Sequence, residues 1–388
     1  GTQQIATNIP ININDFEQVK KTSLELGITM IIVGPEDPLV NGIHDFFARD
    51  EQTKSIAIIG PKKKAASLEG SKDFAKKFLI RHNIPTASYA TFTKDNLNDG
   101  FEFLKTLNPP YVLKADGLAA GKGVLIIDNL EEANNELREM LVGEKFGIAS
   151  SKVVIEEFLD GIELSCFVLT DGVNYKVLPT AKDYKRIGEG DSGLNTGGMG
   201  AISPVPFAKK ELLNKIEQNI ITPTIEGLKK DGIEYQGFIF IGLINVNDEP
   251  KVIEYNVRMG DPETEAVLPR IQNDFVEIFQ SFKDKTLNKI DLKIDNRSAA
   301  TVVLVSGGYP SNYNKGIKIT GIDHVVDSTV YHAGAIQKEG GVYTNGGRVL
   351  AITSFGNNFQ EALDISYKSA SKINFDRMYY RKDLGFDL

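Results

Sequence analysis

The sequence predicts a protein of several domains that combines α/β and α+β architecture, and three observations support this prediction. Its 388 residues are enough to build two to four hydrophobic cores. Near the start, short apolar runs at residues 29–33 and 54–59 alternate with helical patterns, which is typical of a parallel sheet. Further along, short apolar runs bounded by glycine, proline and asparagine indicate hairpins mixed with helices.

The composition excludes several classes of protein. The chain is 41% hydrophobic and 25% charged, which is ordinary for a globular protein, and its net charge is −8. A general nucleic-acid binder is usually basic, so we expect no nucleic-acid partner. The single cysteine, Cys166, cannot form an internal disulfide, and no cluster of histidine and cysteine suggests zinc. No apolar run reaches membrane-spanning length and no signal peptide is visible, so we expect a cytoplasmic enzyme without a membrane partner.

We expect the first domain, residues 1–70, to be a parallel α/β unit. Asn14 with Glu17 three residues later predicts a capped helix, and Pro38 suits the first position of the next helix. The three lysines at 62–64 are interpreted as a solvated face. No strand–turn–helix unit precedes the two strands, so we expect this domain to be incomplete in the sequence.

We expect the second domain to span residues 71–295 and to carry a small α+β subdomain at about 88–158. Ser71 begins an amphipathic helix that leads into this subdomain. The subdomain is predicted to contain a strand at 89–92, a helix at 96–107, a hairpin at 111–128, a helix at 130–141 and a strand at 153–155.

The remaining sequence predicts more sheet, one long loop and a last domain. Residues 181–206 are rich in glycine and have little periodicity, which favours a substrate-binding loop. Pro223 should kink or split the helix that contains it. A polar linker near Asp295 separates a mixed α+β domain at 296–388. The predicted elements are strands at 163–170, 175–179, 238–246, 251–255 and 298–305, and helices at 211–230 and 359–373.

Residues 111–128 join two apolar runs through a loop of glycine and alanine. Lys114 ends the first run, and Lys122 lies between Gly121 and Gly123. Glycine lets backbone N–H groups approach an anion closely, and the lysines add positive charge, so this stretch predicts a phosphate site. Its spacing is not that of a Walker A loop. The alternative is a tight hairpin with two solvated lysines.

The strand at 252–258 places polar side chains on one face. Glu254, Asn256 and Arg258 alternate with apolar residues. Two oxygen ligands on a rigid strand can hold Mg²⁺ that also touches substrate phosphates, and Arg258 could neutralise charge on a transferring phosphoryl group. The alternative is an ordinary exposed strand face.

The run from Glu156 through Glu157 and Phe158 to Leu159 ends a strand at the edge of the subdomain. Extended backbone there could bind the edge of an adenine ring while the two apolar side chains cover its faces. Glu163, shortly afterwards, could accept hydrogen bonds from ribose hydroxyls. Alone, this run would be interpreted as a surface strand end.

In this order along the chain, these features resemble the ATP-grasp superfamily, in which ATP lies between a small lid and a larger sheet domain. Five strings then resemble the phosphoribosylamine–glycine ligase (glycinamide ribonucleotide synthetase) family, and the resemblance covers essentially the whole chain. They are Leu-Glu-Gly-Ser-Lys at 68–72, Leu-Lys-Ala-Asp-Gly-Leu-Ala-Ala-Gly-Lys-Gly-Val at 113–124, Asn-Thr-Gly-Gly-Met-Gly-Ala at 195–201, Gly-Asp-Pro-Glu-Thr at 260–264 and Thr-Asn-Gly-Gly-Arg-Val-Leu at 344–350.

The resemblance implies an incomplete Rossmann-like N-terminal domain, an ATP-grasp core whose lid is the 88–158 subdomain, and a mixed C-terminal domain. It implies ATP-dependent ligation of glycine to 5-phosphoribosylamine in de novo purine (IMP) biosynthesis. The products would be glycinamide ribonucleotide, ADP and phosphate, formed through glycyl phosphate. Mg²⁺ or Mn²⁺ would be the metal cofactor.

The resemblance also implies roles for individual residues. Catalysis is assigned to Arg258, Lys114 and Lys122, and the metal to Glu254 and Asn256. The residues assigned to ATP are Lys72, Lys114, Gly121, Lys122, Gly123, Glu156, Glu157, Phe158, Leu159 and Glu163. The residues assigned to the other substrates are Asp183, Lys185, Thr196, Gly197, Gly198, Arg258, Asp261, Pro262 and Glu263.

Two other functions remain open, and one departure from the family is visible. Another ATP-grasp carboxylate–amine ligase would share the ATP site, and a non-catalytic ATP-binding regulator would bind ATP without glycine-dependent phosphate release. Family members begin with a strand and a glycine-rich turn that helps to hold the substrate phosphate, and this unit is expected to be missing here. A monomer is favoured.

Overall fold

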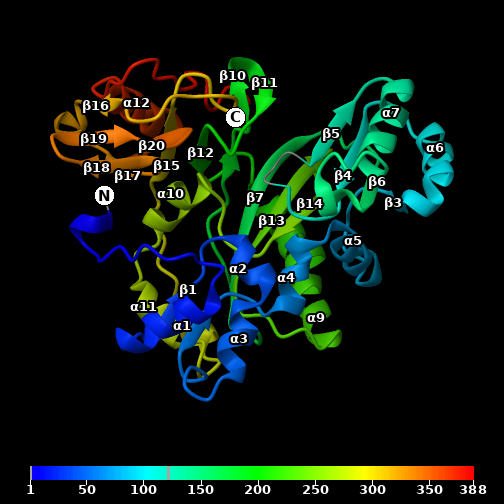
Figure 1. Ribbon diagram of the computed structural model, residues 1–388, viewed down its shortest axis with the longest axis horizontal. Helices are drawn as coiled ribbons and strands as arrows, with labels where there is room; N and C mark the ends of the chain where they lie inside the picture. Colours follow the sequence, from blue (N-terminus) through cyan, green and yellow to red (C-terminus); the bar gives the residue numbers. More distant parts are fainter. Residues whose placement is uncertain (1, 120–122) are drawn as a thin grey trace.

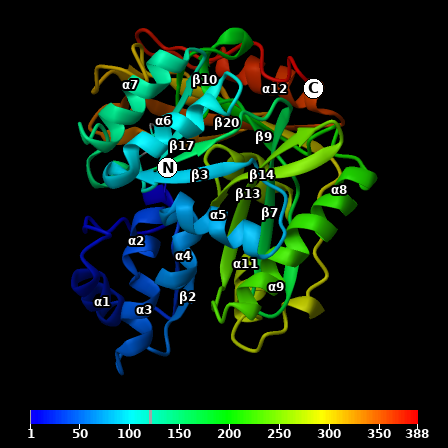
Figure 2. The ribbon, with the colours of Figure 1, turned by 90° about the vertical axis from the view of Figure 1, so that its right-hand side faces the viewer.

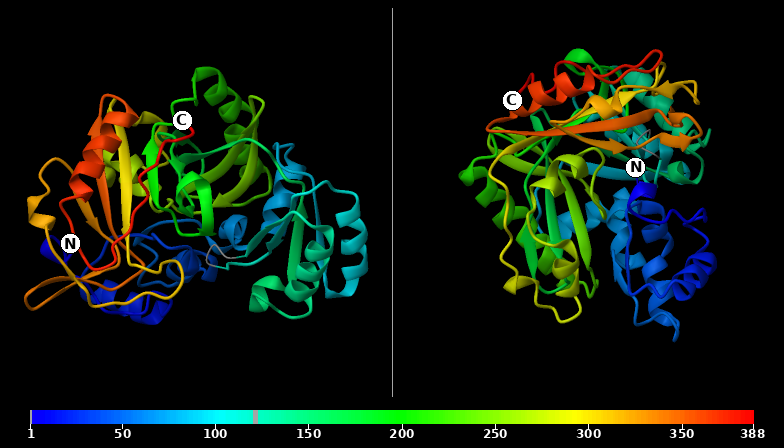
Figure 3. Two further views of the ribbon diagram at one scale, coloured as in Figure 1. Left: turned by 90° about the horizontal axis from the view of Figure 1, so that it is seen from above. Right: turned by 90° about the vertical axis from the view of Figure 1, so that its left-hand side faces the viewer.

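The protein is described by a computed structural model that covers residues 2–119 and 123–388 (Figure 1). The small subdomain lies at one end of the molecule and the C-terminal part at the other, with a central sheet between them (Figure 3). The N-terminal part lies beside this central sheet (Figure 2). Within the described residues, we find no helix with the length and apolar character needed to span a membrane.

The N-terminal part contains the predicted parallel pair of strands. β1 (Met30–Ile32) and β2 (Ala57–Ile59) pair in parallel, which confirms the expected arrangement. Its helices are α1 (Phe16–Glu25), α2 (Glu36–Asn41), α3 (Ile43–Arg49) and α4 (Lys63–Gly70).

Two local predictions for this part were wrong. Asp15, rather than Asn14, caps α1 and accepts a hydrogen bond from the Gln18 backbone at 3.1 Å. Pro38 is the third residue of α2 and not the first. The lysines at 62–64 lead into α4, and exposed Lys63 and Lys64 agree with the predicted solvated face, while the same helix buries Ala65, Ala66 and Leu68 in the core.

The small subdomain is an antiparallel sheet of four strands with two helices. The strand order is β3 (Tyr89–Thr93), β6 (Lys152–Glu156), β4 (Tyr111–Ala115) and β5 (Val124–Ile127). Helices α6 (Leu97–Lys105) and α7 (Leu130–Leu141) pack on it through Leu104 and Leu137. Every element predicted for this subdomain is therefore confirmed, and α7 has the predicted limits.

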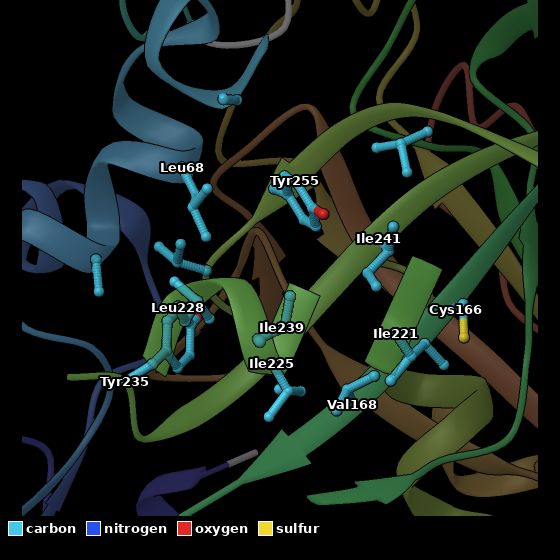
Figure 4. Close-up of a cluster of buried hydrophobic side chains, with 14 of the residues drawn as sticks. Leu68, Cys166, Val168, Ile221, Ile225, Leu228, Tyr235, Ile239, Ile241 and Tyr255 are labelled. Carbon is cyan, nitrogen blue, oxygen red and sulfur yellow. The ribbon is translucent and has the colours of Figure 1, made fainter. Parts of the chain in front are cut away.

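The central sheet has the strand order β14 (Glu249–Asn256), β13 (Gly237–Val246), β7 (Ile162–Thr170) and β8 (Tyr175–Val177). One face is covered by α4, α5 (Lys72–Arg81), α8 (Lys210–Ile216) and α9 (Thr222–Lys230). Figure 4 shows Ile225 and Leu228 of α9 packed against Ile239 and Ile241 of β13. Each such buried side chain contributes about 1.5–3 kcal/mol of transfer free energy. The predicted break at Pro223 is confirmed, because a π-helical turn separates α8 from α9.

Residues 181–206 do not form one long loop, so that prediction was wrong. They contain β9 (Lys182–Asp183), β10 (Arg186–Gly188), β11 (Ser192–Asn195) and β12 (Gly200–Ser203). β12 pairs with β15 (Ser298–Val305), which lies about a hundred residues later in the sequence. Strands of two to four residues are too short to show a period, and the sequence does not reveal a distant partner.

The C-terminal part is built on a sheet with the order β17 (Thr329–His332), β20 (Arg348–Gly356), β15, β12 and β9. This sheet therefore joins strands from both sides of residue 295. Helix α12 (Phe359–Ala370) packs on β15 and β20. The remaining elements are α10 (Glu263–Val267), α11 (Phe275–Gln280), β16 (Lys318–Ile319), β18 (Ala335–Lys338) and β19 (Gly341–Thr344).

Candidate active site

Two buried lysines share one carboxylate where the small subdomain meets the rest of the protein. The Nζ of Lys114, on β4, lies 3.0 Å from Glu156 Oε1, and it donates to the Ile253 carbonyl at 3.4 Å. The Nζ of Lys76, on α5, lies 3.0 Å from Glu156 Oε2. Burial raises the pKa of Glu156, but Lys114 and Lys76 together outweigh burial and hold this pKa below its usual value. One carboxylate serves two ammonium groups, so positive charge is left in excess.

Lys72 adds a third cation to this group. It lies four residues before Lys76, and residues at this spacing share one helix face. Its Nζ donates to the Gly117 carbonyl at 3.5 Å, and burial lowers its pKa. Burial also lowers the pKa of Lys76, to about 8. We call Lys72, Lys76, Lys114 and Glu156 the lysine cluster. Sequence reasoning missed Lys76, although its spacing from Lys72 was visible.

The glycine loop follows Lys114 directly. A Cβ atom at position 123 would lie 2.8 Å from the Ala119 Cβ and 3.2 Å from the Ala115 Cβ, so the close approach of β4 requires Gly123. The predicted Gly121 and Lys122 lie outside the described residues.

The run after β6 is anchored to the start of the subdomain. The Ser88 backbone N–H donates to Glu157 Oε1 at 2.9 Å, and the Glu157 N–H donates to the Ser88 carbonyl at 2.9 Å. The carboxylates of Glu156 and Glu157 are thus engaged within the protein. Phe158 is 39% exposed and Leu159 is half-buried, so these side chains and the backbone are what this run offers to a ligand.

Glu254 and Asn256 lie on the side of β14 away from the helices. Tyr255, between them, is buried in the core and its hydroxyl hydrogen-bonds to the Thr224 hydroxyl at 2.6 Å. Strand alternation therefore turns Glu254 and Asn256 to the opposite face, where Glu254 lines a small pocket. Glutamate and asparagine oxygens are suitable Mg²⁺ ligands. Among the described residues no group of three or more His, Cys, Asp or Glu is placed to hold a metal. Mg²⁺ bound by Glu254 and Asn256 would fill its remaining positions with water or substrate oxygens.

Arg258 is engaged with the N-terminal part of the protein. Its Nε lies 3.1 Å from Glu36 Oε2 and its Nη2 lies 2.8 Å from Glu69 Oε1. The other oxygen of Glu69 accepts from the Val257 backbone at 2.8 Å. Burial raises the pKa of Glu69 to about 7 although Arg258 acts in the opposite direction. Sequence reasoning gave Glu36 and Glu69 no role, and nothing local distinguishes them from other acidic residues.

In a second group of charged side chains, acidic residues outnumber basic ones, which is the opposite of the lysine cluster. The Nζ of Lys185 lies 2.6 Å from Glu163 Oε2 and 4.0 Å from Asp183 Oδ1. Glu263 is 3% exposed and accepts from the Ser165 hydroxyl at 3.2 Å. Burial, followed by the charge of Asp183, raises the pKa of Glu263 to about 8. We call Glu163, Asp183, Lys185 and Glu263 the acidic cluster. Lys185 therefore pairs with two of the three carboxyl groups, and Glu263 is held by Ser165.

Arg348 joins two loops that the sequence assigned to substrate. Its Nη1 donates to the Gly197 carbonyl at 2.7 Å and the Asp261 carbonyl at 2.8 Å. Gly198 has φ +115°, and a side chain there would overlap Pro262. The Thr196 hydroxyl donates to the Lys185 carbonyl at 2.8 Å, which connects these loops to the acidic cluster. The structure therefore brings together site residues from four distant stretches of the chain.

A small antiparallel subdomain beside a larger sheet, with Lys114 on the subdomain and Glu254 and Asn256 on the sheet, has the arrangement of the ATP-grasp class. Sequence models of the phosphoribosylglycinamide synthetase family match nearly the whole chain. The N domain matches residues 1–69, the ATP-grasp (A) domain residues 70–264 and the C domain residues 299–387. The chain belongs to the phosphoribosylglycinamide synthetase family.

Similar proteins carry a consistent name. A phosphoribosylamine–glycine ligase from Vibrio vulnificus (strain CMCP6) is 45% identical over 98% of this chain and 88% of its own length. One from Pseudomonas aeruginosa is 43% identical over 100% of this chain and 89% of its own. The crystal structure of the Thermotoga maritima phosphoribosylamine–glycine ligase matches with a TM-score of 0.85 and 35% identity, over 99% of this chain and 91% of that chain.

More distant structures share the fold alone. The biotin carboxylase domain of Hydrogenobacter thermophilus 2-oxoglutarate carboxylase, in complex with MgADP, has a TM-score of 0.70 at 17% identity, over 96% of this chain and 81% of that chain. These similarities confirm the predicted multidomain ATP-grasp architecture.

Proposed function

We propose that this protein joins glycine to 5-phosphoribosylamine and splits ATP to ADP and phosphate. The observation that carries the proposal is the match to all three domains of one ligase family, with relatives about 45% identical over nearly the full chain. In this reaction the glycine carboxylate attacks the γ-phosphorus, which releases ADP and forms glycyl phosphate. The amine then attacks the glycyl carbonyl, an amide bond forms, and phosphate and a proton leave.

The lysine cluster suits the first step of this reaction. A carboxylate and a triphosphate repel each other, so their approach requires fixed positive charge. Lys72 and Lys114 carry that charge on elements that the surrounding core holds rigidly. Mg²⁺ held by Glu254 and Asn256 would neutralise further phosphate charge, and Mn²⁺ could replace it. Arg258 and Lys122, which lies outside the described residues, are the other residues that we propose to act in catalysis.

The other proposed contacts divide between two regions. We assign the phosphates of ATP to Gly123 and its adenosine part to the 156–159 run and Glu163. The glycine and amine substrates are assigned to Asp183, Lys185 and Glu263 and to the loops joined by Arg348. A glycyl phosphate intermediate is hydrolysable, so closure of the small subdomain over the site would protect it from water. Domain limits near residues 70 and 295, a monomer and a cytoplasmic location are part of the same proposal.

Glycine-dependent ADP release tests this function. The purified protein is incubated with Mg-ATP, glycine and freshly prepared 5-phosphoribosylamine, and ADP and the amide product are measured together. We expect ADP release that requires both glycine and the amine, in a 1:1 ratio with product. ATP binding without glycine dependence would contradict the proposal and favour a regulator. ADP release with a different acid would favour another carboxylate–amine ligase.

A further inference from the structure

The extended segment 182–186 alternates between two environments. Asp183 and Lys185 line the small pocket that also contains Glu254. Lys182 and Tyr184 point the other way, because their polar atoms contact Asp387. Strand geometry turns successive side chains to opposite faces. Contacts that fix Lys182 and Tyr184 therefore also fix the positions of Asp183 and Lys185.

The even-numbered residues are held by the C-terminal tail, which we define as residues 379–387. The Nζ of Lys182 lies 3.1 Å from Asp387 Oδ2. The Tyr184 hydroxyl donates to Asp387 Oδ1 at 3.0 Å. Both oxygens of this one carboxylate therefore hold the back of the segment that carries Asp183 and Lys185.

Arg381 extends the same attachment to residues 186–191. Its side chain is 0% exposed, and its Nη1 lies 2.6 Å from Asp191 Oδ1 and donates to the Arg186 carbonyl at 3.2 Å. Its guanidinium also packs over the Tyr184 ring, 5.3 Å from the centroid. Asp383, paired with Arg381 at 2.8 Å, accepts from the Gly190 backbone at 2.7 Å. A buried, fully paired arginine is costly to disrupt, so the tail is firmly fixed here.

We infer that the C-terminal tail positions the substrate-binding residues Asp183 and Lys185, with Asp387 as the principal positioning residue. The inference rests on the proposed function. No residue of the tail lines the pocket as the structure describes it, and the contacts of Asp387 lie on the opposite face of the segment. A displacement of about 1 Å at reacting groups can reduce rates by about a hundredfold, so this support is significant for catalysis.

The test compares three variants in the full chain. Asp387→Ala removes both contacts to segment 182–186. Asp387→Asn keeps an acceptor for Tyr184 but not the charge that faces Lys182. Lys382→Met is the matched control, since Lys382 is exposed in the same tail and no hydrogen bond or ion pair of its side chain occurs among the described residues. The Michaelis constants for glycine, phosphoribosylamine and ATP are measured, together with the melting temperature.

We expect Asp387→Ala to raise the Michaelis constant for glycine or phosphoribosylamine by about tenfold, as for the loss of charged hydrogen bonds, and to change that for ATP by less than about twofold. Asp387→Asn should restore part of the loss, and Lys382→Met should resemble the wild type. Equal changes for all three substrates, or none, would overturn the inference. A wild-type protein without glycine-dependent turnover would instead contradict the proposed function. Should Asp387→Ala fail to fold, Asp387→Asn and Tyr184→Phe, which removes only the hydroxyl donor, provide the same comparison.

Discussion

The lysine cluster and the acidic cluster are both groups of charged side chains lining one site, but their charge balances are opposite. In the lysine cluster, Lys76 and Lys114 share the single carboxylate of Glu156, which leaves an excess of positive charge. In the acidic cluster, Lys185 pairs with Glu163 and lies 4.0 Å from Asp183, and the buried carboxyl group of Glu263 adds a third acid whose pKa is raised to about 8. Opposite charges at short range stabilise each other strongly where water is excluded. The difference indicates that the lysine cluster is suited to bind an anion and that the acidic cluster is suited to bind a cation or a proton.

The two clusters also differ in how the chain builds them. The lysine cluster comes from α5, β4 and β6, which lie between residues 72 and 156. The acidic cluster combines β7, β9 and α10, and its support includes the C-terminal tail. Both clusters therefore depend on long-range contacts, and the acidic cluster differs in that the C-terminal tail supports it.

The largest expected effect is the loss of the lysine cluster's charge at Lys114. Lys114→Met removes a cation that should contact developing negative charge, so kcat/KM for ATP should fall by roughly 10²–10³-fold. Steady-state kinetics and calorimetric ATP binding measure this. Lys105→Met, at an exposed lysine of the same subdomain, is the control. An unchanged ATP dependence for Lys114→Met would remove the lysine cluster from the ATP site.

The next effect concerns the acidic cluster and pH. The folded protein raises the pKa of Glu263 from 4.5 to about 8 through burial. A raised pKa means that the folded state binds a proton more tightly than the unfolded state, so stability falls as pH rises between these two values. Glu263→Gln cannot ionise and should gain stability relative to the wild type, by about 4 kcal/mol at about pH 8 and little at about pH 4.

Melting temperatures of the wild type and Glu263→Gln across this pH range provide the measurement. Glu277→Gln is the control because Glu277 is exposed in the first turn of α11. A difference between Glu263→Gln and the wild type that stays constant with pH would show that Glu263 does not titrate in this range.

A smaller effect is expected from the removal of Lys76. This lysine shares the carboxylate of Glu156 with Lys114, so we expect it to weaken the neutralisation of Lys114 by that carboxylate. Lys76→Met leaves the carboxylate paired with Lys114 alone, so KM for ATP should rise by roughly tenfold while KM for glycine changes little. Lys77→Met is the matched control, since Lys77 is 63% exposed on the same helix and pairs with Asp73. Equal effects of the two substitutions would show that the effect comes from the helix and not from the shared carboxylate.

The smallest effect concerns the space beside Glu263. A Cβ atom at position 260 would lie 2.6 Å from Glu263 Cδ, so Gly260→Ala should push the carboxylate aside. Because this side chain can move, we expect only about a threefold rise in KM for glycine and no change for ATP. Gly34→Ala is the control, since a Cβ atom there meets no atom within 4 Å. A rise in KM for ATP would show that Gly260 supports the whole site and not the acidic cluster alone.

The sequence by itself determined the local elements and much of the nucleotide side. Ser71 capped α5 as predicted, the 111–128 hairpin formed, and alternation in β14 turned Glu254 and Asn256 away from the core. These features follow from caps, turns and periods that act within a few residues. The order of the motifs indicated the family, which the family models and the similar proteins confirm.

Only the tertiary structure decided which charged side chains form ion pairs. Lys76 and Lys77 are neighbours in one helix, yet one is buried against Glu156 and the other is exposed beside Asp73. β12 pairs with β15, about a hundred residues away, and with β9. Asp387, near the end of the sequence, contacts Lys182. Ion pairs and short strands depend on burial and on distant partners, which the packing of the whole chain sets and no local pattern records.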